Sequence, residues 1–342
     1  MPEPLNQPAL TSALTVGMRV VLRHRTGGGL TDALGEVTAA SPVELVVQTR
    51  RGPVTVARDT VVAAKEVPPA PVRRGAPHLA ISMADLQEVM VTGMPPLRSA
   101  WLGKWLLRES DTYTGRANSA LPLGDPGLPL DEALPAVIDW YVDRGQVPLL
   151  QICGPDGFAV SSEVVGAAAL DAGWTAFQRT LVLTASVERL VALAPVEDES
   201  AVRVTDRPGT DWWAGAAERE QDHRSTAENI FAEVEDGGYI VLTGDSGPVA
   251  VGRVAYASAW VGVFCVHVQP ACRRAGLARQ VMAVAARDAH LRGVRSMYLQ
   301  VSRDNEAAVA LYRSLGFRIH HEYWYLRAPP DRHLPSAPTV AH

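Results

Sequence analysis

The sequence contains little cysteine, and this limits the chemistry that it can support. Only Cys153, Cys265 and Cys272 occur among 342 residues, and no two of them form a Cys-x-x-Cys pair. Three scattered thiols exclude a disulfide framework, and no set of His and Cys has the spacing of zinc ligands. We interpret the three cysteines as small buried side chains or idle thiols, and we expect no metal.

Long apolar runs and an excess of basic charge are also missing. Lys and Arg number 32 against 37 Asp and Glu, which gives a formal net charge of -5. A dedicated nucleic-acid-binding protein usually shows a basic excess, and a membrane-spanning helix needs about 20 apolar residues in a row. The first residues lack the basic cluster and apolar stretch of a secretory signal. We expect a cytoplasmic protein without a direct nucleic-acid or membrane partner.

Aromatic residues are absent from the first 66 residues, which contain short valine-rich runs between turn-forming residues. Such runs at close, even spacing predict a small antiparallel barrel over residues 1–66, similar in size and rhythm to a Tudor barrel. The basic residues at 23–25 and 50–51 form either a patch for an acidic partner or a solvated rim. We favour the rim, because a nucleic-acid-binding surface usually adds stacking aromatics.

The rest of the chain predicts a linker followed by two regions that mix helices and strands. Residues 67–77 are rich in proline and should be extended. Residues 78–200 and 201–328 each alternate helical and strand patterns, including one strand over 101–108. Residues 329–342 have the composition of a disordered tail. The predicted fold class is α+β.

An internal repeat connects the two mixed regions. Residues 162–174 align without a gap on residues 305–317, and each segment is a predicted helix followed by glycine and an aromatic residue. A glycine directly after a helix supplies a left-handed cap. A strand pattern follows each segment at matching distance. The two regions are therefore predicted to be copies of one αβ unit.

The sharpest sign of chemistry is an alternating, mostly apolar strand that ends at Val268 and leads through a loop into a helix. That helix opens with Arg-Arg-Ala-Gly-Leu-Ala at residues 273–278. A helix N-terminus after a strand presents unpaired N–H groups and the positive end of the helix dipole, which together bind phosphate oxygens. Gly276 lets the backbone approach the anion, Ala278 is small enough not to block it, and the two arginines add charge.

This Arg-x-x-Gly-x-Ala pattern resembles the pyrophosphate-binding motif of the GNAT superfamily of N-acetyltransferases. The resemblance extends to Asn305 and to the Leu-Tyr and Leu-Gly-Phe that follow it, and it covers roughly residues 201–328. It implies tandem GNAT-like halves, the second of which transfers acetyl directly from acetyl-CoA to an amine.

The resemblance also implies residue roles. In GNAT folds the strand before the loop parts from its neighbour, and the pantetheine arm bonds its free backbone groups. The implied acetyl-CoA-binding residues are Val266, His267, Val268, Arg273, Arg274, Ala275, Gly276, Leu277, Ala278 and Asn305. Tyr312 is implied as the general acid that protonates the departing thiolate.

Two of these residues have a plainer interpretation. Tyr312 shares a helical stripe with Ala308 and Leu315, as a core aromatic would, and only the GNAT context favours catalysis. For His267 we favour a half-buried strand side chain over a base for the acceptor amine. Many GNAT enzymes place a Glu near the start of this strand, but residues 259–262 are Ala-Trp-Val-Gly.

The general base is therefore unassigned. Water relayed to Glu228, Glu233 or Glu322 gives three alternatives that the sequence does not rank.

The first copy of the repeat lacks the catalytic parts. Ala169 stands in the place of Tyr312, and Ser162 stands in the place of Asn305. We expect a degenerate GNAT-like half that binds no CoA and helps to shape the acceptor cleft. Residues 114–124 either add polar groups to that cleft or form an edge strand.

The whole layout resembles an actinobacterial GNAT group with a Tudor-like barrel, a degenerate middle half and a catalytic C-terminal half. That resemblance implies an acceptor such as a lysine of a histone-like nucleoid protein, while small amines and peptide N-termini stay open, as does the oligomeric state. A non-catalytic acetyl-CoA sensor is the alternative function. The intact Asn305 and Tyr312 favour the enzyme, since a sensor does not need the phenol.

Overall fold

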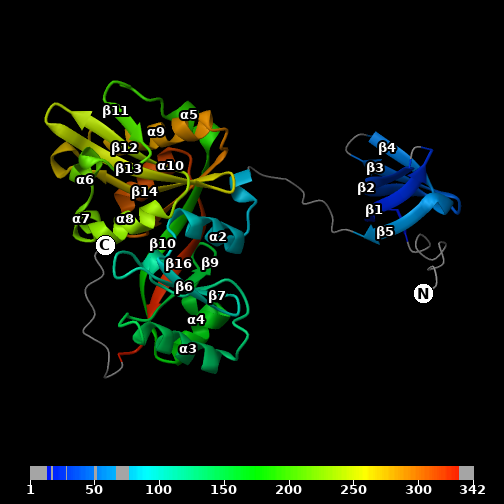
Figure 1. Cartoon of the computed structure of the whole chain (residues 1–342), viewed down its shortest axis with the longest axis horizontal. Coiled ribbons are helices and arrows are strands. Elements are labelled where there is room, and N and C mark those ends of the chain that lie inside the picture. Colours follow the sequence, from blue (N-terminus) through cyan, green and yellow to red (C-terminus); the bar gives the residue numbers. More distant parts are fainter. Residues whose placement is uncertain (1–13, 17, 28, 50–51, 67–76, 331–342) are drawn as a thin grey trace. The chain divides into compact units, whose positions relative to one another are not determined.

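A computed structural model describes most of the chain, namely residues 14–16, 18–27, 29–49, 52–66 and 77–330 (Figure 1). The chain divides at residues 74–75 into two compact units. The linker predicted at 67–77 lies outside the described residues except for Pro77. The tail predicted at 329–342 lies outside them except for Pro329 and Pro330.

The first unit is a five-stranded antiparallel sheet in the order β4-β3-β2-β1-β5. Its strands are β1 (Arg19–Thr26), β2 (Gly29–Ala40), β3 (Glu44–Thr49), β4 (Gly52–Ala57) and β5 (Val61–Glu66). Alternate residues point inward, so that Val20, Leu22, Leu45 and Val47 share one core. A small all-β module is confirmed here.

Two basic residues of this unit are paired or buried within it. Arg23 on β1 pairs with Asp32 on β2 at 2.8 Å, and His24 is buried at 6% exposure. Residues 50–51 lie outside the described residues. Two of the residues proposed for an acidic-partner patch are therefore engaged within the module.

The second unit is built on an eight-stranded sheet in the order β11-β12-β13-β14-β15-β10-β16-β9, with a small sheet β6-β7-β8 beside it. Its strands are β6 (Arg98–Leu102), β7 (Trp105–Glu109), β8 (Leu121–Pro122), β9 (Leu149–Gly154), β10 (Thr175–Ser186), β11 (Val202–Thr205), β12 (Gly237–Gly244), β13 (Gly247–Ala257), β14 (Trp260–Val268), β15 (Ser296–Ser302) and β16 (Arg318–Arg327). The single strand expected over 101–108 is wrong, because the chain reverses between β6 and β7 through Gly103, which has a φ of 53°.

Helices cover both faces of the large sheet. They are α2 (Met83–Gly93), α3 (Leu130–Val142), α4 (Val164–Asp171), α5 (Val187–Leu193), α6 (Thr210–Gly215), α7 (Glu218–Asp222), α8 (Arg224–Ala232), α9 (Leu277–Leu291) and α10 (Glu306–Ser314). Side chains of α5, α9 and α10 share one core with one face of the central strands. Those of α2, α6 and α8 share another core with the opposite face. Among the described residues no helix is both long and apolar enough to cross a membrane.

The two copies of the repeat meet in the part of this sheet that ends at β9. Helix α4 and strand β10 form one copy, α10 and β16 form the other, and both helices end before a glycine with positive φ. Strand β10 lies between β15 and β16, and β16 lies between β10 and β9. The corresponding strands β10 and β16 run antiparallel, with Thr180 opposite Tyr323. Each copy thus contributes its last strand to a sheet that it shares with the other copy. The domain boundary near residue 200 stays a prediction.

Candidate active site

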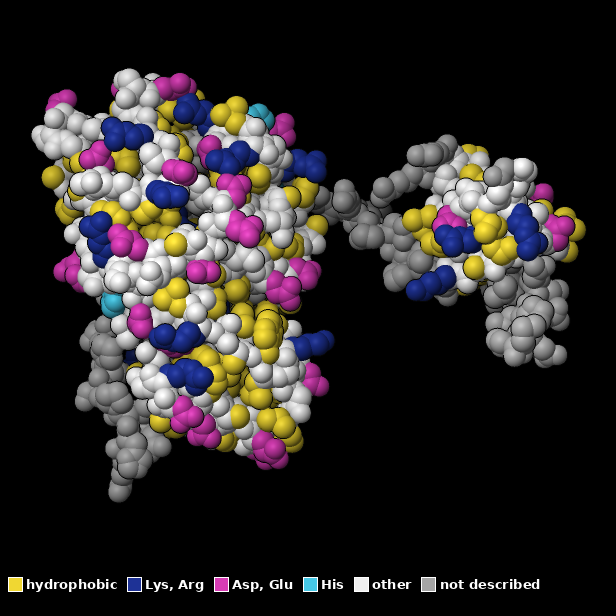
Figure 2. All heavy atoms as spheres, viewed as in Figure 1, with side chains coloured by type: hydrophobic (Ala, Val, Ile, Leu, Met, Phe, Trp, Pro, Cys, Tyr) yellow, Lys and Arg dark blue, Asp and Glu magenta, His cyan; other side chains and the backbone are white. Residues whose placement is uncertain are grey.

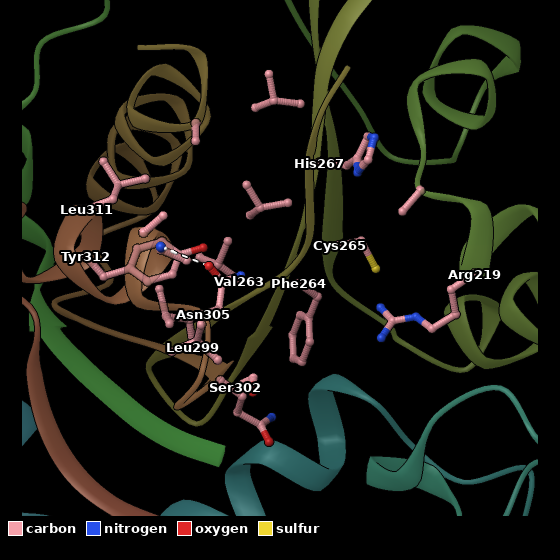
Figure 3. Close-up of a pocket in the computed structure, with 18 of the residues that line it drawn as sticks. Arg219, Val263, Phe264, Cys265, His267, Leu299, Ser302, Asn305, Leu311 and Tyr312 are labelled. Carbon is pink, nitrogen blue, oxygen red and sulfur yellow. Dashed lines mark hydrogen bonds between the residues drawn. The ribbon is translucent and has the colours of Figure 1, made fainter. Parts of the chain in front are cut away.

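Two parallel strands separate at the centre of the large sheet. Strands β14 and β15 pair only from Trp260 to Val263 and from Ser296 to Leu299. Beyond that point β14 stays paired with β13, and β15 stays paired with β10. The two strands therefore face each other with backbone groups that the sheet does not use. A cavity of about 1110 Å³ opens between them (Figure 3).

A bulge in β14 accompanies the separation. The register with β13 shifts between Val251 and Arg253, and Cys265 adopts a φ of 51°. An extra residue in one strand bends it and strengthens its twist. The bulge therefore gives a local cause for the divergence of β14 from β15.

Most residues proposed from the sequence line this cavity. They are Val266, His267, Val268, Arg273, Arg274, Gly276, Leu277, Ala278, Asn305 and Tyr312. Ala275 is exposed and is not among the lining residues. The strand end and loop at residues 266–278 and the helix that begins after Asn305 therefore meet at one place.

The loop before α9 has the shape expected of an anion site. Gly276 immediately precedes the helix with a φ of 77°, and no side chain caps the first turn. A Cβ at Gly276 would have no atom within 4 Å, so open space lies beside the backbone. The first N–H groups of a helix have no partner within it, and Arg273 and Arg274 are exposed beside them. These residues fit a pyrophosphate.

Tyr312 belongs both to the core and to the cavity wall. Its ring packs edge-on against Phe317 with centroids 5.8 Å apart, and 8% of the residue is exposed. Burial raises the pKa of Tyr312 to about 12. No hydrogen-bond partner of its hydroxyl is found among the described residues. The phenol is thus protonated at neutral pH and free to donate.

Asn305 has a local role that the sequence analysis did not foresee. Its Oδ1 accepts a hydrogen bond from the backbone N–H of Ala308 at 3.1 Å, and so it caps α10 (Figure 3). Capping uses the carbonyl oxygen and leaves the side-chain amide N–H groups for a ligand in the cavity.

His267 lies half-buried on β14, on the side that also faces Arg219, whereas Tyr312 and Leu311 lie on the other side of the strand (Figure 3). Burial, and then the charge of Arg273, hold the pKa of His267 below its ordinary value. The imidazole is therefore neutral near pH 7. Its use as a base stays a hypothesis.

The three glutamates offered as relays lie elsewhere. Glu228 is exposed and pairs with Arg224, and Glu233 is exposed at the end of α8. Glu322 is fully buried between Arg179 and Arg303. None of the three glutamates is among the residues that line the cavity.

Sequence analysis missed the wall formed by α7. Glu218, Glu220 and Asp222 on this short helix line the cavity, together with Arg219. The only signal was a run of charged residues after a Trp pair, and such a run usually marks a solvated helix. The wall also includes Arg116, from the segment 114–124 that was proposed to reach the cleft.

Comparison with known structures identifies the fold. A GCN5-related N-acetyltransferase from Kribbella flavida matches 73% of this chain and 98% of its own, with a TM-score of 0.52 and 18% identity. A tandem GNAT protein from the clavulanic acid biosynthesis pathway matches 75% of this chain and 91% of its own, with a TM-score of 0.52 and 12% identity. The fold is that of GNAT proteins, as the sequence motifs predicted.

Comparison with protein families is more specific. Residues 82–326 match the family described as "Probable histone acetyltransferase Rv0428c C-terminal", and residues 14–65 match the "Rv0428c N-terminal Sm-like domain". The chain belongs to this acetyltransferase family. A relative from Mycobacterium tuberculosis, named "Probable histone acetyltransferase Rv0428c", is 29% identical over 326 residues, which cover 92% of this chain and 95% of the relative. The small barrel predicted at the N-terminus corresponds to the Sm-like module.

Proposed function

We propose that this acetyltransferase moves the acetyl group of acetyl-CoA directly to an amine in the cavity between β14 and β15. The observation that carries the proposal is the meeting, in one cavity, of separated strands, an uncapped helix start and a protonated phenol. Each of these features supplies one requirement of the reaction. The strands bind the pantetheine arm, the helix start binds the pyrophosphate, and the phenol supplies a proton.

The residues act as follows in this proposal. The pyrophosphate lies on residues 273–278, where helix N–H groups and two arginines neutralise its charge. Backbone N–H groups of residues 266–268 hold the pantetheine arm and polarise the thioester carbonyl. The acceptor ammonium first gives a proton to water, and the neutral amine then attacks the carbonyl carbon. The C–N bond forms, the nitrogen loses its second proton to water and the C–S bond breaks. Tyr312 gives its proton to the departing thiolate and recovers one from water.

We propose a protein lysine as the acceptor, such as one on a histone-like nucleoid protein in the cytoplasm. The support is the name of the M. tuberculosis relative, together with the carboxylates of α7 on the cavity wall. We further propose that residues 78–200 bind no CoA. Ala169 replaces the tyrosine in that copy and is fully buried in a core of its own.

We also propose that the larger unit does not bind nucleic acid nonspecifically. Basic and acidic side chains are interspersed over the face shown in Figure 2. A continuous basic stripe is the usual footprint for a polyanion.

The test measures thiol release from acetyl-CoA with three acceptors: a lysine-containing basic peptide, a peptide whose only amine is its N-terminus, and a polyamine. We expect turnover that depends on the acceptor and is fastest with the lysine peptide. Calorimetric binding of acetyl-CoA without turnover on any amine would instead identify a sensor.

A further inference from the structure

One buried carboxylate on the cavity wall is not used in the proposed acetyl transfer. Glu220 on α7 lines the cavity, although only 1% of the residue is exposed. Its Oε1 accepts hydrogen bonds from the Tyr113 hydroxyl at 3.1 Å and from Arg219 Nε at 3.0 Å. A buried carboxylate requires such partners, because leaving it unpaired in a dry interior is costly.

The second oxygen of this carboxylate is free. Every hydrogen bond of Glu220 falls on Oε1, and Oε2 has no partner among the described residues. Although it lacks a partner among those residues, Oε2 is not completely enclosed by protein atoms. Within the described part of the chain, one oxygen of the carboxylate is therefore without a partner at the cavity wall, while the other is fixed by two donors.

Tyr113 ties this group to the first half of the larger unit. Burial raises the pKa of Tyr113 well above its ordinary value, so its hydroxyl stays a donor. The guanidinium of Arg219 also lies 5.6 Å over the ring of Tyr113. The carboxylate is thus held by a residue of the half that lacks the catalytic tyrosine.

Charge in the cavity changes sign between its two ends. The loop and first turn of α9 supply Arg273, Arg274 and Arg279, whereas α7 supplies three carboxylates against the guanidinium groups of Arg219 and Arg116. Arg116 is directed to the carbonyl of Gln300, at 3.5 Å. An anion is favoured at the first end and a cation at the second.

We propose that Glu220 binds the ammonium group of the acceptor through Oε2, and that Tyr113 positions the carboxylate for it. This inference rests on the proposed function and narrows the acceptor class to alkylammonium compounds. A lysine side chain and a polyamine share that chemistry.

The experiment compares steady-state kinetics of the full chain and the variant Glu220→Gln, with a lysine peptide in one arm and spermidine in the other. A hydrogen bond to a charged group contributes about 1.5–3 kcal/mol, so the KM for the amine should rise about 10- to 100-fold. The acetyl-CoA affinity should change by less than about twofold, because its site uses other residues. Of the lysine peptide and spermidine, the amine with the lower wild-type KM shows whether the ammonium comes from a lysine side chain or from a polyamine.

Two further variants separate binding from folding. Glu132→Gln is the matched control, because Glu132 is exposed on α3 and lies outside the cavity lining, and it should leave the KM within about twofold. Tyr113→Phe retains the ring and the charge of Glu220, and it should raise the KM about fivefold with kcat nearly unchanged. This variant serves as the test if Glu220→Gln fails to fold.

The outcomes are distinct. An unchanged amine KM in Glu220→Gln, or in Tyr113→Phe should Glu220→Gln not fold, overturns the role of Glu220 and leaves the acetyltransferase proposal intact. Absence of thiol release by the wild type with every amine overturns the proposed function, and this inference falls with it.

Discussion

Ala169 and Tyr312 occupy corresponding places in the two copies of the repeat, yet their surroundings differ. Ala169 is fully buried in the core that α3 and α4 form with β9, whereas Tyr312 touches both a core and the cavity. Both copies keep the helix, the glycine with positive φ and the long strand. The comparison indicates that packing preserves the backbone of such a unit, while function depends on a few side chains that packing does not require.

The largest expected effect concerns Tyr312. Tyr312→Phe removes one hydroxyl and keeps the packing against Phe317. General acids contribute about 10²–10⁴-fold to rate, so turnover should fall by that factor with acetyl-CoA affinity unchanged. The matched control is Tyr298→Phe, which removes a hydroxyl from a buried ring outside the cavity lining. Equal rates for wild type and Tyr312→Phe would leave Tyr312 as a core residue like Ala169.

The next effect concerns the contact between the copies. Glu322 on β16 is fully buried and accepts hydrogen bonds from Arg179 on β10, Arg303 and the N–H of Gly157. Breaking a buried ion pair costs about 3–5 kcal/mol, so Glu322→Gln should lower the stability of the whole larger unit. All eight tryptophans lie in that unit, so their fluorescence reports its unfolding alone.

The control for that variant is Asp156→Asn, which removes the exposed partner of Arg303 at 2.8 Å and should cost less than about 1 kcal/mol. A shared sheet predicts one unfolding transition in the wild type and in both variants. Two separate tryptophan transitions would show that the copies fold independently.

A smaller effect is expected at the phosphate site. Arg274→Glu reverses a charge beside the start of α9 and should weaken acetyl-CoA binding about 10- to 100-fold by calorimetry. Arg144→Glu is the control, because Arg144 is exposed in the first half, where it contacts the carbonyl and the ring of Trp140, and lies outside the cavity lining. Equal acetyl-CoA affinities for wild type and Arg274→Glu would remove this arginine from the site.

The smallest effect concerns pH. Because burial raises the pKa of Tyr312 to about 12, the phenol stays protonated and competent up to that pH, and it is lost only above it. The kcat profile should therefore show no fall that depends on Tyr312 between about pH 7 and 9.5. A falling limb near pH 8–9 that disappears in Tyr312→Phe would contradict the environment described for this residue.

The residues that line the cavity could be singled out from the sequence where they lie in short contiguous patterns. The loop at 273–278 and the helix start at Asn305 follow from short motifs, whereas the parting of a strand near Val266 was implied by the GNAT resemblance. The two helix-glycine-strand copies were visible for the same reason.

Features that depend on distant pairing were not predictable. Nothing in the local pattern of residues 175–186 indicates that this strand pairs between β15 and β16. Residues 101–108 have an apolar run that hides a turn at Gly103. Glu220 was missed because the Tyr113 hydroxyl that bonds its carboxylate lies 107 residues away in the chain.

The most direct test of the difference between the copies is a calorimetric titration of acetyl-CoA into the full chain and into Gly276→Asp. Aspartate tolerates positive φ better than most residues, and here it would place a carboxylate in the space beside the helix start. Gly293→Asp is the matched control, because Gly293 has a φ of 74° and open surroundings after the other end of α9. We predict one equivalent bound by the wild type and by Gly293→Asp, with at least tenfold weaker binding by Gly276→Asp. Two equivalents per chain, or equal affinity in Gly276→Asp, would contradict it.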